Sequence, residues 1–115
     1  MNFLIIVWWL LVAHALCDFS LQTDAMAKGK NRHSIVTPPP NQNYVPCWQY
    51  WLSAHALIHG GSVAFVTGSV PLGLIATFIH WVTDFLKCEN YTTPHIDQLI
   101  HGLTIIFIAY IAGAK

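Results

Sequence analysis

Apolar residues fall into four long stretches separated by shorter polar segments. The stretches cover about residues 3–26, 48–66, 71–86 and 96–112. Each is close to the length that an α-helix needs to cross roughly 30 Å of hydrocarbon at about 1.5 Å per residue. The pattern therefore predicts an all-α fold, a four-helix transmembrane bundle that forms one integral membrane domain over residues 1–115.

The segments between the stretches predict how the helices connect. Gly68 followed by Pro71 is typical of a helix end and an immediate restart, so the second and third stretches should form an αα-hairpin. A polar, proline-rich loop over 28–46 joins the first two stretches, and a shorter loop over 88–94 joins the last two.

Basic residues predict the orientation of the bundle. Lys28, Lys30 and Arg32 lie in loop 28–46 and Lys87 lies at the start of loop 88–94, whereas the turn at 67–70 has none. Positive residues favour the cytoplasmic side, so both loops should be cytoplasmic and both termini outside. The alternative is a cleaved signal peptide ending near residues 13–15, which the missing basic residue ahead of the apolar run argues against.

Composition supports the membrane interpretation and excludes other classes. Only 9% of the 115 residues are charged and 55% are hydrophobic, with a mean hydropathy of +0.50. An ordinary soluble domain has roughly 25% charged residues, so a soluble monomer is not expected. Net charge is zero, which gives no electrostatic case for nucleic acid. The lipid bilayer is the expected partner, and a homo-oligomer is compatible with the pattern.

Seven histidines stand out against this low charge, and ionisable residues recur four positions apart in every apolar stretch. Residues at i and i+4 share one helix face, so each pair presents two groups in one direction. On the predicted orientation, all four pairs lie near the cytoplasmic end and form a His- and Asp-lined polar layer. Ionisable groups in hydrocarbon are costly and generally mark function. The pairs are His14 with Asp18, His55 with His59, His80 with Asp84, and Asp97 with His101.

Imidazole and carboxylate are ligands for divalent transition metals such as Zn, Fe or Mn. Eight candidates exceed the four ligands of a single zinc, so the sequence allows one or two ions. We expect the five paired histidines to be ligands, and Asp18, Asp84 and Asp97 to complete the shell or act as catalytic bases toward a metal-bound water. Gln22 and Gln98 are expected to hold a water or a substrate oxygen.

Three functions remain open on the sequence. The first is metal-dependent hydrolysis of an ester or phosphoester on a lipid-linked or small-molecule substrate. The second is a proton or metal-ion relay in transport, since chains of Asp and His serve that role. The third is a non-catalytic membrane factor that acts through a partner, in which the pairs only satisfy one another and Asp84 pairs with Lys87.

Several motifs resemble a family of small polytopic bacterial and phage membrane proteins, a domain of unknown function. The most specific is H-x-x-x-D-F-x-L-Q, which begins at His14. The others are His55-x-x-x-His59-Gly60, His80-x-x-x-Asp84 and Asp97-Gln98-x-x-His101. The resemblance implies a multi-pass protein of a bacterial inner membrane or a host-cell membrane and no established activity. The insert at 37–46 and Cys17 depart from the family pattern.

Overall fold

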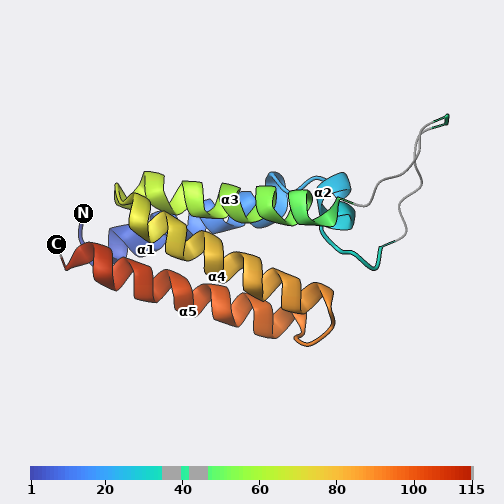
Figure 1. Cartoon of the computed structure of the whole chain (residues 1–115). Helices are drawn as coiled ribbons and strands as arrows, with labels where there is room; N and C mark the ends of the chain where they lie inside the picture. Colours follow the sequence, from blue (N-terminus) through green and yellow to red (C-terminus); the bar gives the residue numbers. More distant parts are fainter. Residues whose placement is uncertain (35–39, 42–46, 115) are drawn as a thin grey trace.

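The computed structural model describes residues 1–34, 40, 41 and 47–114 (Figure 1). Its described part contains helices and no strand, which confirms the all-α prediction. Most of the predicted proline-rich loop lies outside the described residues. The elements are α1 (Phe3–Ala15), the π-helix η1 (Leu16–Ser20), α2 (Asp24–Gly29), α3 (Trp48–Thr67), α4 (Val70–Cys88) and α5 (Pro94–Gly113).

The predicted first helix over 3–26 is wrong at its C-terminal end. The backbone widens into a π turn after Ala15, and the N–H of Leu21 donates to the carbonyl of Leu16. The helix then stops, because Thr23 adopts an extended conformation and its hydroxyl caps the next helix by accepting from the N–H of Met26. A short separate helix, α2, therefore replaces the last turns of the predicted span.

The four long segments α1/η1, α3, α4 and α5 form a bundle. Each packs against two neighbours in the order α1, α3, α4, α5 and back to α1. The two termini and the α3–α4 turn lie at one end, while α2 and the α4–α5 loop lie at the other (Figure 1). The predicted hairpin turn is present: Gly68 ends α3 with a φ of +66°, and the Ser69 hydroxyl caps α4.

Two glycines bring α3 and α4 into close contact. A Cβ atom on Gly60 would lie 1.7 Å from Thr77 Oγ1, and one on Gly73 would lie 2.6 Å from the carbonyl oxygen of Gly60. Neither position has room for a side chain. This close approach sets the spacing at which residues farther along α3 and α4 face each other.

The bundle divides into an apolar half and a polar half. Near the termini, buried aliphatic residues from α1, α4 and α5 form the core, with Leu10 and Ile108 each 1% exposed. Beyond them, toward α2, the buried residues include histidines, aspartates and Lys30. The outer surface is apolar instead, and Phe65 and Phe78 are 90% and 71% exposed.

Two segments are long and apolar enough to cross a membrane, Phe3–Ser20 and Pro94–Gly113. The sequence predicted four such spans. Polar side chains such as Gln49 and His55 in α3, and Asp84 and Lys87 in α4, lower the hydropathy of these two helices. The finding supports a membrane protein, and the four-span arrangement stays a prediction.

Candidate metal centre

Asp18 lies at the centre of the polar half. Its Oδ1 accepts from Nε2 of His59 at 2.8 Å, and Nε2 of His55 and of His80 lie 3.4 and 3.9 Å from the same oxygen. Its Oδ2 faces Nε2 of His14 at 3.2 Å. One carboxylate therefore gathers imidazoles from α1, α3 and α4.

The π turn places this carboxylate. Asp18 is the third residue of η1, and π turns inside helices are frequent at functional sites. The His14–Asp18 contact predicted from the i, i+4 spacing is present, although the second residue lies on a π turn and not on an α-helix.

Four of these side chains have the types and spacing that could hold a metal ion. Asp18, His55, His59 and His80 each offer one ligand atom, and these atoms all lie within 4.8 Å of one another. A tetrahedral ion with ligands at about 2.0–2.1 Å separates its ligand atoms by about 3.3–3.4 Å. The distances from Asp18 Oδ1 to the three imidazoles lie on both sides of that value.

Two histidines of this group have buried nitrogens without a hydrogen-bond partner, and so does His101 outside the group. His55 and His80 are 1% and 4% exposed, and Nε2 of each is unpartnered, as is Nδ1 of His55. Buried polar atoms are normally hydrogen-bonded, so unpartnered ones require an explanation such as a missing ion or water. These atoms point to a ligand between α3 and α4.

Sequence reasoning missed Lys30, which it treated as a charge in a cytoplasmic loop. Lys30 is 5% exposed, and its Nζ donates to Asp84 Oδ2 at 2.6 Å and to Gln22 Oε1 at 2.5 Å. Only one signal could have found it: Lys30 is four residues after Met26, so the two share the buried face of α2. Gln22 follows the end of η1, where its Nε2 donates to the backbone carbonyl of Asp18 at 3.1 Å and its Oε1 accepts from Lys30.

Lysines also surround the two other predicted aspartates. Lys87 Nζ lies 3.0 Å from Asp84 Oδ1 and 3.4 Å from Asp97 Oδ2. Asp97 also faces its i+4 partner, since His101 Nε2 lies 3.3 Å from Asp97 Oδ2. Asp84 and Asp97 thus have ammonium counter-ions, whereas Asp18 faces imidazoles and amides. The expected Asp84–Lys87 pairing is present.

Gln98 links α5 to the centre. Its Nε2 donates to Asp18 Oδ2 at 3.0 Å, and its Oε1 lies 3.1 Å from Nε2 of His14. All eight predicted ligands and Gln98 therefore lie in one continuous cluster, although only four of the eight form the compact ligand group.

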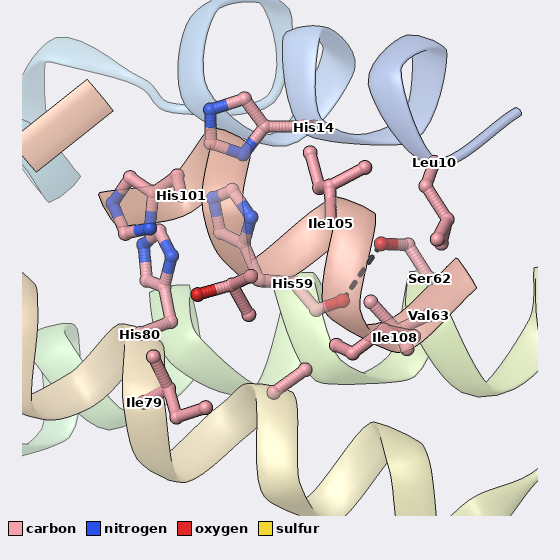
Figure 2. A pocket seen from close by; sticks show the side chains of 12 residues that line it. Leu10, His14, His59, Ser62, Val63, Ile79, His80, His101, Ile105 and Ile108 are labelled. Carbon is pink, nitrogen blue, oxygen red and sulfur yellow. Dashed lines mark hydrogen bonds between the residues drawn. The ribbon is translucent and has the colours of Figure 1, made fainter. Parts of the chain in front are cut away.

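A small cavity adjoins the cluster on its apolar side. It has a volume of about 40 Å³ and separates His14, His59, His80 and His101 from the aliphatic core (Figure 2). The His80 ring stacks on those of His59 and His101, with centroids 3.6 and 4.4 Å apart. One or two water molecules fit such a space.

A separate ionic contact lies on the surface beside the cluster. Both Arg32 and His33 contact the carboxylate of Glu89, which follows α4. Hydrogen bonds from Arg32 first and His33 second lower the pKa of Glu89 from its ordinary 4.5 to about 2. This contact ties the segment after α2 to the α4–α5 loop.

The bundle and its interior define a small all-helical protein with a buried histidine–aspartate cluster. The family described as a protein of unknown function, DUF3307, matches residues 6–115, so the chain belongs to that family. This match confirms the resemblance to a domain-of-unknown-function family that the motifs indicated. No curated protein and no solved structure matches the chain.

Proposed function

We propose that this chain is an integral membrane protein that binds one divalent transition metal ion, and that the ion supports hydrolysis of an ester or phosphoester. Asp18, His55, His59 and His80 are the proposed ligands. The observation that carries the proposal is the approach of their ligand atoms to within 4.8 Å, in a buried site with unpartnered imidazole nitrogens. Three histidines and one carboxylate form a ligand set that zinc accepts.

The lysines restrict the proposal to one ion. Asp84 contacts both Lys30 and Lys87, and an ammonium group beside a carboxylate competes with a metal for its oxygens. We therefore assign Asp84 and Asp97 to the support of the site and not to its ligands. The Asp84 carboxylate lies 3.6 Å from Nε2 of His55, which places its negative charge beside the ligand group without a hydrogen bond to that ring.

Hydrolysis is the chemistry that the surroundings favour. An ion held by these four side chains would have to accept a water as a fifth ligand, and it would then lower the pKa of that water toward neutrality. His14 is the side chain placed to move a proton there, because its Nε2 contacts Asp18 and Gln98 at the more exposed edge of the site, with 15% of its side chain exposed. In this proposal Gln98 keeps the role expected from the sequence, which is to bind a substrate oxygen through its amide N–H.

The proposed membrane embedding rests on the distribution of charged and apolar side chains, which is the reverse of that in a soluble protein. Charged groups are buried, while large apolar side chains of α1, α3, α4 and α5 are exposed: Trp8 is 64% exposed, Phe65 90%, Phe78 71% and Leu103 59%. A bilayer would cover such a surface at no cost. In this proposal all four long helices lie in the membrane, with α2 and loops 28–46 and 88–94 on the cytoplasmic side.

Metal content per chain tests the site. We expect about one zinc, iron or manganese ion in detergent-purified protein, as four ligands require, and loss of that ion in Asp18→Asn and His59→Ala. His101→Ala and His95→Ala should keep it, because neither belongs to the ligand group. Absence of metal from folded, helical wild-type protein, or equal retention in all variants, would overturn the proposal.

A proton relay is the second candidate, and the stacked imidazoles favour it. The rings of His59, His80 and His101 follow one another from the centre toward α5 at 3.6 and 4.4 Å. A relay needs no bound metal. Proton flux in proteoliposomes that is abolished by His101→Ala, with metal absent throughout, would favour this candidate over hydrolysis.

Thiol labelling tests the orientation. Of the three free cysteines, Cys17 and Cys88 are buried, and Cys47, the N-cap of α3, is partly exposed. A membrane-impermeant maleimide should label Cys47 in inverted vesicles and not in intact cells. Labelling from outside would reverse the proposed topology.

A further inference from the structure

An open apolar groove runs between α1 and α5 and ends at the cluster. Its volume is about 310 Å³. Val7 and Leu11 line one side, and Leu99, Leu103 and Ile106 line the other. Gln98 is the only polar residue along it, and Gln98 contacts both Asp18 and His14. The groove therefore connects the outer surface of the bundle with the candidate metal centre.

Gly102 leaves the space that forms the groove. It lies in the middle of α5, one turn after Gln98, where helices disfavour glycine. A Cβ atom on Gly102 would meet nothing within 4 Å. Unlike Gly60 and Gly73, Gly102 does not allow two helices to approach, and the open space beside it belongs to the groove.

We propose that this groove holds one acyl chain of a membrane lipid and brings the polar part of that lipid to Gln98 and His14. The substrate class would then be a lipid with an ester or phosphoester bond, which enters sideways from the bilayer. Hydrolysis of the bound lipid rests on the proposed function, whereas binding of its acyl chain in the groove can be tested separately.

Three observations favour an acyl chain over other occupants. The groove lies between the two segments that are long and apolar enough to cross a membrane, so it would face lipid. A soluble metabolite would find no polar partner along the groove except Gln98. The groove ends at Gln98, which contacts Asp18 and His14, so its lining fits an occupant with an apolar chain and a polar end.

Filling the groove tests the proposal. Gly102→Leu places a side chain in the open space, where its Cβ atom meets nothing within 4 Å, and leucine favours the helix more than glycine does. Gly61→Leu is the matched control, because a Cβ atom there also meets nothing within 4 Å and the residue is exposed on α3, away from the groove. The probe is a phospholipid with a photoreactive acyl chain, added in small amounts to detergent-solubilised protein.

We expect crosslinks at groove residues of α1 and α5 in the wild type and in Gly61→Leu, and loss of those crosslinks in Gly102→Leu. Metal content should be unchanged in both variants, which separates failure of the groove from failure of the metal site. Equal crosslinking of Gly102→Leu and wild type in the groove, or crosslinks spread evenly over all helices, would overturn the lipid site. Groove crosslinks in a metal-free wild type would retain the lipid site and overturn the metal proposal.

Discussion

Replacing Lys30 by methionine removes the ammonium group that the sequence alone did not place in the cluster. The side chain of methionine has a similar length and no charge. Lys30 Nζ lies 2.6 Å from Asp84 Oδ2, and the two side chains are 6% and 1% exposed. Lys30→Met therefore leaves a buried carboxylate with one counter-ion fewer and deprives Oε1 of Gln22 of its donor.

The expected loss of stability in Lys30→Met follows from the burial of the ion pair and from the second lysine that remains beside Asp84. Breaking a buried ion pair by removing one partner costs about 3–5 kcal/mol. Asp84 keeps Lys87 at 3.0 Å, so we expect the lower end, a loss of about 3 kcal/mol in the free energy of unfolding. In the double variant Lys30→Met/Asp84→Asn the stranded charge is gone, and the double variant should be less destabilised than Lys30→Met alone.

The assay is reversible unfolding in mixed detergent micelles, followed by far-ultraviolet circular dichroism. Lys28→Met is the control in the same helix, because Lys28 and its partner Asp24 are 62% and 83% exposed. An exposed pair contributes about 0–1 kcal/mol, so this control should be close to the wild type. Equal stability of Lys30→Met and Lys28→Met would refute the placement of Lys30, and additive losses in the double variant would refute its coupling to Asp84.

Two further predictions concern helix packing and pH. Gly60→Ala should destabilise the bundle by about 1–3 kcal/mol or more through overlap with Thr77, while Gly61→Ala at an open position should be neutral or stabilising; similar stability of the two variants in the same unfolding assay would contradict the close contact. The second prediction concerns pH. Because its partner Arg32 lowers the pKa of Glu89 to about 2, the contact between Arg32 and Glu89 should be fully formed above the ordinary pKa of 4.5 and should be lost as pH falls toward 2. Hydrogen exchange of residues 31–34 should report this loss in the wild type and show no such pH step in Glu89→Gln.

Much of the helical architecture could be predicted from the sequence, because apolar run length and turn residues determine helices locally. The predicted ranges 48–66, 71–86 and 96–112 lie within two residues of the ends of α3, α4 and α5. The first range failed because apolar residues continue through 16–21 whether the backbone is an α-helix, a π turn or a break. Hydropathy does not report the extended conformation of Thr23 that ends the segment.

The meeting of the eight paired residues could also be predicted, since i, i+4 spacing on apolar helices directs them into one interior. The sequence could not predict which of the eight form the compact ligand group around Asp18 and which, such as Asp84 and Asp97, contact lysines instead. That division depends on α2 folding back so that Lys30 reaches Asp84, a contact between residues 54 positions apart. Locally, Lys30 differs from the exposed Lys28 only in lying four residues after the buried Met26, and that spacing does not predict contact with Asp84.

The chain has only five acidic residues, so the counter-ion of each can be compared, and Asp18 differs from the other four. Asp24, Asp84, Glu89 and Asp97 each contact a lysine or an arginine within the described part of the chain. Asp18 is the remaining acid, and its contacts there are imidazoles and the Gln98 amide. A buried carboxylate requires a compensating charge, and histidines supply one only if they are protonated or share a cation with it. One imidazolium would balance the carboxylate, but several packed at ring-centroid distances of 3.6–5.2 Å would repel one another, so the other rings stay neutral. A shared metal cation satisfies the carboxylate and all of these neutral rings together. This requirement is the physical reason to look for a metal ion at Asp18 and not at Asp84 or Asp97.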